Sequence, residues 1–394
     1  MNEIRVGIIG IGNMGTAHAN NIYAGNIKGM KLAAVCDIRK VRRDFCTEAY
    51  KDVAVFENGE EMIKSGLIDL LIVAVPHYYH TDYVEMALKN GLHALTEKPA
   101  DVLASRAKSI HELAKKSGKV FGIMFNQRTN PLFAKAREIV QSGALGELKR
   151  SVWIITNWYR TQSYYDSGEW RATWAGEGGG VLLNQAPHNL DLWQWICGMP
   201  VKLRAFCEQG KYHNIEVEDD ATLFATYANG ATGTFITTTG EYPGTNRLEI
   251  SGDLGKIVLE EGVLKWWKLG VPERKFCFES AEGFAQIPCE YVEIRPDEPE
   301  TGHSGILQNL ANAILYGEEL LAPGYDGIKE LTLSNAAYLS SWCGNKEIAL
   351  PFDEQTAEEF AAELKKRADA SNYKESAVVE KMSGEYSKRW QVRW

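Results

Sequence analysis

The chain has 394 residues, of which 45% are hydrophobic, and it carries a formal net charge of -9 at pH 7. This length exceeds what one hydrophobic core usually supports, so we expect two globular domains. A negative net charge without a basic tract argues against nucleic acid or an anionic membrane as a partner. The seven cysteines contain no C-x-x-C pair, which argues against a disulfide framework and a structural zinc site.

The amino-terminal sequence MNEIRVGIIGIG becomes strand-like within four residues and does not resemble a signal or transit sequence. No apolar run approaches the roughly 20 residues that a membrane-spanning helix needs. We therefore expect the protein to stay in the cytoplasm, where small molecules and copies of itself remain as candidate partners.

The first predicted element is a β-strand at residues 4–10, IRVGIIG. Gly10, Gly12 and Gly15 follow in G-x-G-x-x-G spacing and open a helical stretch. In this arrangement the first glycine permits a turn, the second lets the backbone approach a pyrophosphate, and the third lets the helix pack on the strand. We expect these three glycines to bind a dinucleotide together with the first helical amides, at Asn13 and Met14.

A second strand, KLAAVCD, ends at Asp37, 22 residues after Gly15, where a carboxylate can bind the hydroxyls of an adenosine ribose. Asp37 would repel a 2′-phosphate, so NAD is favoured over NADP. A basic group just beyond it could attract that phosphate or form the solvated face of a helix; it consists of Arg39, Lys40, Arg42 and Arg43. The alternative to a nucleotide site is that the turn at Gly10, Gly12 and Gly15 serves only the packing of the helix on the strand.

Strands continue to alternate with helices through IDLLIVAVP, HALTEKP and KVFGIMFN. This alternation predicts a doubly wound parallel sheet, a Rossmann domain over residues 1–125. Ligands of such sheets bind at the carboxyl ends of the strands. The residues expected there are Pro76, His77, His80, Glu97 and Lys98.

Three motifs at the ends of predicted strands together resemble the Gfo/Idh/MocA family of glucose-fructose oxidoreductases and inositol dehydrogenases. They are GIGNMG, VPHYYH at residues 75–80 and EKP at 97–99. In that family the glycine loop holds the dinucleotide, the proline loop borders the nicotinamide, and the EKP lysine reaches the nicotinamide ribose and the substrate. The resemblance therefore implies a catalytic role for Lys98. It implies cofactor contacts for the Pro76–His80 loop and Glu97, although the family usually has Asn or Pro in place of His77.

The segment GGGVLLNQAPHNLDLW, residues 178–193, places Asn184, His188 and Asp191 on one face at helical spacing. Family members commonly carry GGG followed by D-x-x-x-H, whose histidine is the catalytic acid/base, and the matching positions here are Asn184 and His188. With Asn in place of Asp, we expect Asp191 to orient the imidazole. Pro187 removes a backbone donor just before His188 and is expected to kink the helix. A subset of sugar-oxidising members, including levoglucosan dehydrogenase and enzymes that oxidise glycosides at C3, is similar in having N-Q-x-P-H.

Alcohol oxidation by NAD needs a hydride acceptor, a base for the hydroxyl proton and a cationic group near the developing alkoxide. We expect His188 to accept the proton and Lys98 to hold the reacting oxygen, both in reach of one alcohol in a cleft between the domains. From the residues alone, His188 could instead be a buried helix histidine satisfied by Asp191, and Lys98 a solvated surface lysine.

From Glu147 onward, several long strands joined by short turns predict a large, mostly antiparallel open sheet, with one turn at Asn229 and Gly230. Helices are expected at about 304–317, 327–344 and 354–369. The overall class is therefore α/β, with an α+β substrate-binding and oligomerisation domain at 126–372 and a tail at 373–394. The family resemblance implies that the sheet forms a homodimer or homotetramer.

Six of the eleven tryptophans lie between Trp153 and Trp195, among tyrosines and arginines. Flat rings pack against the C–H faces of sugars, which suits a carbohydrate, although core packing explains any single ring equally well. The expected substrate-binding residues are Arg128, Asn157, Tyr159, Trp174, Asn184 and Asp191. By resemblance, Trp170 and Arg171 approach the nicotinamide and belong to the cofactor site.

We therefore expect an NAD-dependent oxidoreductase that transfers a hydride between nicotinamide and a secondary hydroxyl of a sugar, glycoside or cyclitol, with C3 of a glucoside as one candidate. One alternative is an NAD-dependent glycosidase or lyase that works by transient oxidation and elimination. A dinucleotide-binding regulator without chemistry is the other. No metal is expected, because H-E-x-x-H is absent and His77 with His80 lacks a convincing third ligand.

Overall fold

The structure is a computed structural model, and it describes residues 3–168 and 170–372. The chain divides into two compact units. The first holds the residues up to Thr129 with 175–178 and 301–331, and the second holds 130–174, 179–300 and the chain from Thr332 onward. The expected continuous second domain at 126–372 differs from this division, since residues 301–331 return to the first unit. The expected tail at 373–394 lies outside the described residues.

The first unit is built on a six-stranded sheet of order β3-β2-β1-β4-β5-β6, in which every described pairing is parallel. The strands are β1 (Ile4–Ile9), β2 (Met30–Cys36), β3 (Ala54–Phe56), β4 (Leu70–Val73), β5 (His93–Thr96) and β6 (Phe121–Ile123). The strand order reverses between β1 and β4, the point where such sheets bind ligands. The prediction of a doubly wound parallel sheet is confirmed.

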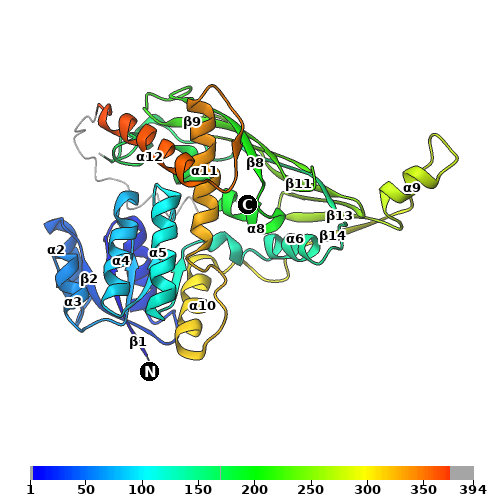
Figure 1. Cartoon of the computed structure of the whole chain (residues 1–394). Helices are drawn as coiled ribbons and strands as arrows, with labels where there is room; N and C mark the ends of the chain where they lie inside the picture. Colours follow the sequence, from blue (N-terminus) through cyan, green and yellow to red (C-terminus); the bar gives the residue numbers. More distant parts are fainter. Residues whose placement is uncertain (1–2, 169, 373–394) are drawn as a thin grey trace. The chain divides into compact units, whose positions relative to one another are not determined.

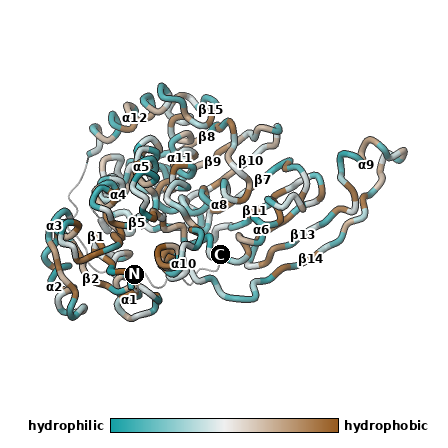
Figure 2. The backbone as a smooth tube through the Cα atoms, turned by 60° about the horizontal axis from the view of Figure 1, so that its bottom comes forward, coloured by the Kyte–Doolittle hydropathy of each residue, from teal (hydrophilic) through white to brown (hydrophobic). Residues whose placement is uncertain are grey.

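Helices cover this sheet because each connection between parallel strands must cross over. They are α1 (Asn13–Tyr23), α2 (Lys40–Ala49), α3 (Gly59–Lys64), α4 (His80–Lys89), α5 (Ala104–Ser117) and α10 (Gly302–Tyr316), with short turns η1 (His77–Tyr79) and η2 (Asn126–Thr129). Helices α4 and α5 lie side by side (Figure 1). Leu71, Val84 and Ile110 join the sheet to α4 and α5 in one buried core, and Figure 2 shows the hydrophobic character of β1 and β2.

The second unit contains a nine-stranded sheet of order β14-β13-β12-β11-β7-β10-β9-β8-β15. The strands are β7 (Leu148–Ile155), β8 (Lys202–Gln209), β9 (Glu218–Thr226), β10 (Thr232–Thr238), β11 (Asn246–Gly252), β12 (Gly255–Glu260), β13 (Val263–Leu269), β14 (Cys289–Ile294) and β15 (Ile348–Ala349). Within this nine-stranded sheet, β7 and β10 are the only described pair that runs parallel. The predicted, mostly antiparallel sheet is confirmed, and Asn229 and Gly230 form the turn between β9 and β10.

One face of this sheet is packed against helices. The remaining elements are α6 (Pro131–Gln141), α7 (Gln162–Tyr165), the π-helix η3 (Val181–Gln185), α8 (Pro187–Cys197), α9 (Glu273–Glu279), α11 (Asp326–Trp342) and α12 (Glu354–Asp369). Ring contacts hold α6 and α8 to the sheet, with centroid distances of 5.7 Å for Phe133 and Trp153 and 5.5 Å for Trp193 and Phe235. The division between the two units falls inside α11.

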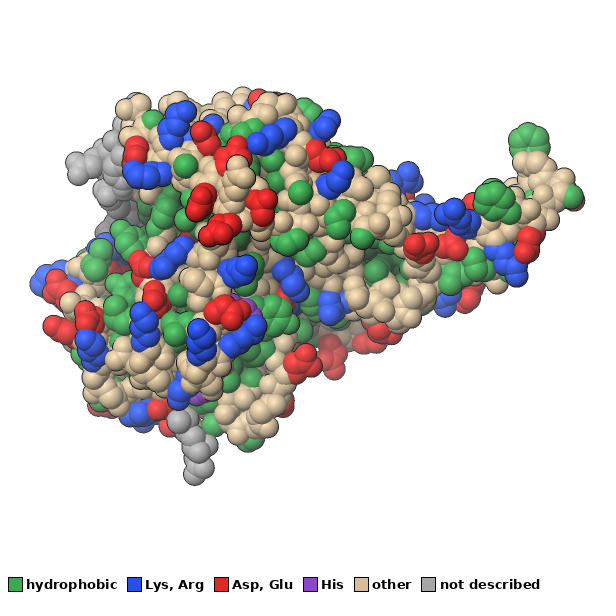
Figure 3. Space-filling model, in the orientation of Figure 1, with side chains coloured by type: hydrophobic (Ala, Val, Ile, Leu, Met, Phe, Trp, Pro, Cys, Tyr) green, Lys and Arg blue, Asp and Glu red, His purple; other side chains and the backbone are tan. Residues whose placement is uncertain are grey.

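Strands β13 and β14 and helix α9 form an extension at one end of the sheet (Figure 1). Helix α9 buries none of its residues. Phe278 and Phe284 are 81% and 101% exposed, and Figure 3 shows hydrophobic side chains at the far end of the extension.

No helix within the described ranges is long and apolar enough to cross a membrane. All seven cysteines are free thiols. Three of them, Cys36, Cys46 and Cys207, are buried, and burial raises the pKa of the Cys36 thiol to about 12. These thiols are therefore poor nucleophiles at neutral pH.

Candidate active site

The glycine loop follows β1 and leads into α1. Gly10 has φ +87°, and a side chain there or at Gly15 would overlap a backbone carbonyl, Ala74 O and Gly10 O respectively. A Cβ at Gly12 would meet no atom within 4 Å. Helix α1 has no side-chain cap and no acidic residue in its first turn, so its positive end is available to an anion. The loop therefore fits a dinucleotide pyrophosphate.

Asp37 lies at the carboxyl end of β2 and is 7% exposed. Its carboxylate accepts hydrogen bonds of 2.8 Å from the backbone of Ile11 and of Arg39, which ties the strand end to the glycine loop. The nearby basic side chains are partly neutralised, because Lys40 pairs with an aspartate at 2.7 Å and Arg43 with a glutamate at 2.8 Å. Asn13 and Met14 form the first turn of α1 and are half-buried.

The loop after β4 carries Pro76 and two of the predicted histidines. His77 Nδ1 lies 2.9 Å from the carbonyl oxygen of Glu177. His80 is 1% exposed, and its two ring nitrogens lie 2.6 and 2.7 Å from the carbonyl oxygens of Pro99 and Val75. Because both nitrogens contact backbone, His80 joins the loop after β4 to the loop after β5. We therefore expect His80 to position these two loops at the cofactor site, instead of contacting the cofactor through its ring nitrogens.

Glu97 follows β5 and is bound by a histidine that sequence inspection did not single out. His18, on α1, is 1% exposed and places Nε2 2.7 Å from Glu97 Oε1. Burial alone would raise the pKa of Glu97. The hydrogen bond and charge of His18, with His303 and Lys98 nearby, instead lower it to about 2. His18 stands three residues after Gly15 on the nucleotide-binding helix, and that position is the only local signal for it.

Lys98 lies at the carboxyl end of the parallel sheet, as predicted. It follows Glu97 directly and is half-buried, and its backbone N–H donates to Glu97 Oε2 at 3.3 Å. A lysine side chain is ordinarily an ammonium cation at neutral pH. The first unit therefore presents a cation at the edge of the sheet where ligands of this fold bind.

The segment containing His188 differs from the expected helix with a proline kink. Residues Val181–Gln185 form the π-helix η3, and α8 begins afresh at Pro187. The interruption falls at Pro187 because proline has no N–H to donate and fits best in the first turn of a helix. Asn184 and His188 thus lie on consecutive segments. His188 is 8% exposed, and Asp191, on the same helix, is 0% exposed.

The glycines before η3 make room for a buried acid. A Cβ at Gly179 would overlap the hydroxyl of Tyr338, and one at Gly180 would overlap the backbone oxygen of Glu218. The Glu218 carboxylate accepts hydrogen bonds of 2.8 Å from Gly180 N, 2.9 Å from Leu182 N and 2.8 Å from the Tyr338 hydroxyl. Burial raises the pKa of Glu218 to about 7, although these donors oppose the rise. Nothing in the sequence near Gly180 points to Glu218.

A tyrosine that no motif indicated connects three segments of the second unit. The Tyr164 hydroxyl oxygen accepts from Arg171 Nη1 at 2.8 Å, Gln185 Nε2 at 3.1 Å and Asn184 Nδ2 at 3.5 Å. The Arg171 guanidinium also lies 4.6 Å from the ring centres of Tyr164 and Trp170. Asn184 and Arg171, predicted from separate motifs, are thus brought together.

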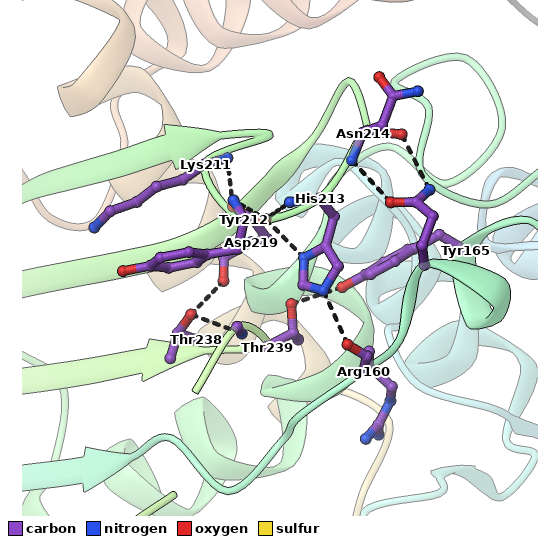
Figure 4. Close-up of polar contacts among 11 residues, drawn as sticks. Arg160, Tyr165, Lys211, Tyr212, His213, Asn214, Asp219, Thr238 and Thr239 are labelled. Atoms are coloured by element: carbon purple, nitrogen blue, oxygen red, sulfur yellow. Dashed lines mark hydrogen bonds and ion pairs between the residues drawn. The ribbon is translucent and has the colours of Figure 1, made fainter. Parts of the chain in front are cut away.

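The segment before Tyr164 is fastened to the sheet by a half-buried histidine and a buried aspartate (Figure 4). Asp219 is 0% exposed, accepts backbone N–H groups of residues 211–213, and lies 2.8 Å from His213 Nδ1. His213 Nε2 lies 2.9 Å from the carbonyl oxygen of Arg160, and the hydroxyl of Tyr165 lies 2.7 Å from Thr239 Oγ1. These contacts hold residues 160–165 in place.

The remaining predicted substrate residues lie in different surroundings. Arg128 is 2% exposed and forms an ion pair of 2.7 Å with Asp326, so the guanidinium is engaged inside the first unit and differs from the substrate contact expected of it. Trp174 is 4% exposed and packs edge-on against two aromatic rings, as a core residue does. Asn157 is half-buried, and its buried Oδ1 has no hydrogen-bond partner among the described residues. Tyr159 is 44% exposed.

Within the described part of the chain, no group of three or more His, Cys, Asp or Glu side chains is arranged to hold a metal ion.

Comparison with known proteins identifies both halves of the chain. Residues 4–125 match the model of an oxidoreductase family with an NAD-binding Rossmann fold, and residues 133–258 match the GFO/IDH/MocA C-terminal domain. The inositol 2-dehydrogenase of Rubrobacter xylanophilus is 29% identical over 197 residues, 49% of this chain and 52% of that protein. The D-glucoside 3-dehydrogenase of Escherichia coli is 30% identical over 200 residues, 50% of this chain and 55% of that protein.

The chain thus matches about half the length of these curated relatives. Among solved structures, the WlbA dehydrogenase of Bordetella pertussis, in complex with NADH and UDP-GlcNAcA, has a TM-score of 0.74 at 24% identity, covering 89% of this chain and 100% of that one. That likeness supports the fold. Because the two family models span well over half of the sequence, the chain belongs to the Gfo/Idh/MocA family, and its first unit is the family's NAD-binding Rossmann domain.

Proposed function

We propose that the protein is an NAD-dependent oxidoreductase acting on a secondary hydroxyl of a sugar, glycoside or cyclitol. The observation that carries the proposal is Lys98, a half-buried cation at the carboxyl end of β5, in the same unit as a glycine loop with space at Gly12. A regulator that only bound the dinucleotide would have no use for a lysine held beside the ionised, buried Glu97.

The residues proposed to hold NAD are the glycine loop, the amino end of α1 and Asp37. Open space at Gly12 admits a pyrophosphate, and the Asp37 carboxylate can accept from ribose hydroxyls while repelling a 2′-phosphate. When bound, NAD supplies the acceptor for the hydride that leaves the alcohol carbon. NAD is preferred to NADP because the Asp37 carboxylate would repel a 2′-phosphate. Lys40 and Arg43, which could attract that phosphate, already form ion pairs with acidic side chains.

We assign the proton chemistry to His188 and Lys98. His188 accepts the hydroxyl proton, because an imidazole with a reference pKa of about 6.5 is largely neutral at working pH. The Lys98 ammonium donates a hydrogen bond to the reacting oxygen and stabilises the negative charge that develops on it. Asn184 orients the substrate or the imidazole beside it.

The substrate class rests on the relatives and on two side chains of the second unit. Relatives named inositol 2-dehydrogenase and D-glucoside 3-dehydrogenase act on polyhydroxylated rings. The unpartnered Oδ1 of Asn157 can accept from a substrate hydroxyl, and the exposed ring of Tyr159 can pack against a pyranose face. Oxidation at C3 of a glucoside is the specific reaction we would test first.

A panel of monosaccharides, cyclitols and glycosides with NAD and NADP, followed at the absorbance of the reduced nicotinamide, tests the proposal. Lys98→Met should lower turnover by about 10³-fold and leave folding intact. Lys89→Met, at a lysine whose side chain is 61% exposed, is the matched control and should retain activity. Unchanged turnover in Lys98→Met would contradict the assignment. Release of phenol from aryl glycosides without NADH would instead indicate a glycosidase or lyase.

We further propose that the uncovered face of the nine-stranded sheet forms a homodimer or homotetramer. Phe206 and Phe224 are each 47% exposed, and the strand register places them on one face with Ile154 and Ile236. Phe224→Glu should reduce the mass measured by light scattering to that of a monomer. Phe284→Glu, on the extension outside this face, is the control, and an unchanged mass in Phe224→Glu would exclude this interface.

A further inference from the structure

Glu218 is a buried acid that caps the π-helix η3 from a different part of the chain. It is the first residue of β9 and is 0% exposed. The first N–H groups of a helix have no partners within the helix, and a side-chain oxygen commonly accepts from the second helical residue. In η3 that residue is Leu182, whose N–H donates to Glu218 Oε1 at 2.9 Å, while Gly180 N donates to Oε2 at 2.8 Å. One carboxyl group from β9 therefore supplies both acceptors at the start of η3.

Helix η3 has five residues, which is too short to keep its conformation without support. Gly180, at its amino end, provides no side-chain cap, and a Cβ there would overlap the backbone oxygen of Glu218. The absence of a side chain thus allows the close backbone approach that brings the distant carboxyl group to η3. The conformation of η3 therefore depends on its contact with Glu218.

Backbone hydrogen bonds connect η3 to the turn of α8 that bears His188. Val181 O accepts from Ala186 N at 2.7 Å, which closes the π turn. Ala186 O accepts in turn from Asn189 N at 3.0 Å and from Leu190 N at 2.9 Å, and these bonds form the first turn of α8. His188 lies within that turn. A change in η3 would therefore move the backbone that presents the imidazole.

The third donor to Glu218 comes from α11. Tyr338 is 0% exposed, and its hydroxyl donates to Glu218 Oε1 at 2.8 Å. The ring of Tyr338 is stacked on Trp342 at a centroid distance of 5.6 Å and meets Trp174 edge-on at 5.4 Å. Oε1 thus accepts two hydrogen bonds and Oε2 one, which is within the capacity of a carboxylate. The three donors together fix the orientation of the carboxyl group.

All three donors are uncharged, so burial raises the pKa of Glu218 to about 7 in spite of them. The titratable side chains that face Glu218 within the described ranges are Tyr338 on α11 and Cys207 on β8. Burial raises the pKa of both well above the ordinary value, so both stay neutral. Because the folded pKa of Glu218 lies above the ordinary 4.5, the closed arrangement favours the protonated acid, and this contribution is lost as pH rises through 7.

We propose that Glu218 is a positioning residue for the dehydrogenase reaction: its carboxyl group caps η3 and thereby fixes the turn of α8 that bears His188. This inference rests on the proposed function. Glu218 exchanges no proton with the substrate and acts only through the backbone of η3.

Hydrogen exchange tests the cap without NAD or substrate. Mass spectrometry of the peptide covering residues 179–186, corrected for intrinsic exchange rates, reports the protection of the η3 amides. Between pH 6 and pH 8.5 we expect this protection to fall about ten-fold in the wild type, because opening of η3 hydrates the ionised carboxylate. Glu218→Gln cannot ionise and should change by less than about two-fold. Glu208→Gln, at an exposed site on β8, is the matched control and should follow the wild type. Equal changes in the wild type and Glu218→Gln would overturn the proposal.

Glu218→Gln and Tyr338→Phe form a pair that separates positioning from general support. Gln presents an NH₂ group to one of the donors, so a backbone bond of the cap is lost. Tyr338→Phe removes the third bond to the same carboxyl group and leaves the bonds from Gly180 and Leu182 intact. With methyl β-D-glucoside and myo-inositol at pH 7, Glu218→Gln should lower kcat about ten-fold and leave the dissociation constant for NAD unchanged. Tyr338→Phe should keep kcat within about two-fold. Equal losses of kcat in the two variants would contradict the inference.

The exchange measurement separates this inference from the proposed function, since it uses neither cofactor nor carbohydrate. Failure of the wild-type protein to reduce NAD with any carbohydrate would refute the proposed function. Protection of η3 that did not depend on pH in the wild type would refute the role of Glu218 alone.

Discussion

Glu97 and Glu218 are both buried carboxylates, one in each unit, and their pKa values move in opposite directions. Burial acts to raise the pKa of both. His18 and other basic groups overcome this at Glu97 and lower its pKa to about 2, whereas Glu218 has only backbone N–H groups and a tyrosine hydroxyl as donors and rises to about 7. The charge of the partner, rather than the number of hydrogen bonds, decides the direction.

This difference gives the two units different electrostatic behaviour near neutral pH. Glu97 stays ionised beside Lys98 over the whole working range, so the cation there keeps a constant environment. Glu218 exchanges a proton close to pH 7 beneath the turn that carries Asn184 and His188. We therefore expect the pH response of the protein to originate mainly in the second unit.

The largest effect is expected from removing His18, the partner that makes the pKa shift of Glu97 opposite to that of Glu218. His18→Leu leaves the buried Glu97 carboxylate without its hydrogen-bond partner and should destabilise the protein by about 3 to 5 kcal/mol in denaturant unfolding. His18→Gln keeps a donor but no charge, and should raise the pKa of Glu97 so that it resembles Glu218. Equal stability of His18→Leu and wild type at pH 7 would refute the pairing.

The second prediction concerns the pH dependence of Glu218. Its pKa rises from 4.5 to about 7 on folding, so it favours the folded state most below pH 4.5 and loses this contribution as pH rises through 7. The difference corresponds to about 3 kcal/mol. Glu218→Gln should therefore gain about this amount relative to wild type between pH 4.5 and 8, measured by urea unfolding. Glu208→Gln, at an exposed site on β8, should show no such trend.

The third prediction uses one glycine from each unit. Gly180→Ala forces a Cβ into the backbone oxygen of Glu218 and should cost about 2 kcal/mol of stability. Gly12→Ala meets no atom within 4 Å, so it should leave the unfolding midpoint unchanged and weaken NAD binding. Thermal unfolding with and without NAD distinguishes the two. A stable Gly180→Ala protein would show that the turn can move.

The smallest expected effect is at Asp37. Asp37→Ala removes the carboxylate that repels a 2′-phosphate and should shift the ratio of kcat/KM for NAD over NADP by about ten-fold towards NADP. Glu48→Ala, which removes one negative charge from an exposed site on α2, is the control. An unaltered ratio in Asp37→Ala would place cofactor selectivity elsewhere.

Much of the first unit was predictable, because its signals are local. Strand, glycine turn and helix follow one another within about twenty residues, and the carboxyl ends of parallel strands necessarily share one edge of the sheet, which places Asp37, Glu97 and Lys98 there. The late helices were also predicted closely, as α10, α11 and α12 span residues 302–316, 326–342 and 354–369. Periodicity in each of these segments is enough to define the element.

Only the tertiary structure revealed the partners of the catalytic candidates. His18 on Glu97, Glu218 beneath Gly180 and Tyr164 on Asn184 join residues that are 79, 38 and 20 positions apart, and such contacts leave no periodic trace in the chain. The form of the interruption at Pro187 could not be read from the sequence either, because a proline can kink a helix or begin one, and here α8 begins at Pro187 after η3. Local patterns determine which elements form and where the nucleotide loop lies, whereas burial and charge between distant segments determine how each site residue ionises and points.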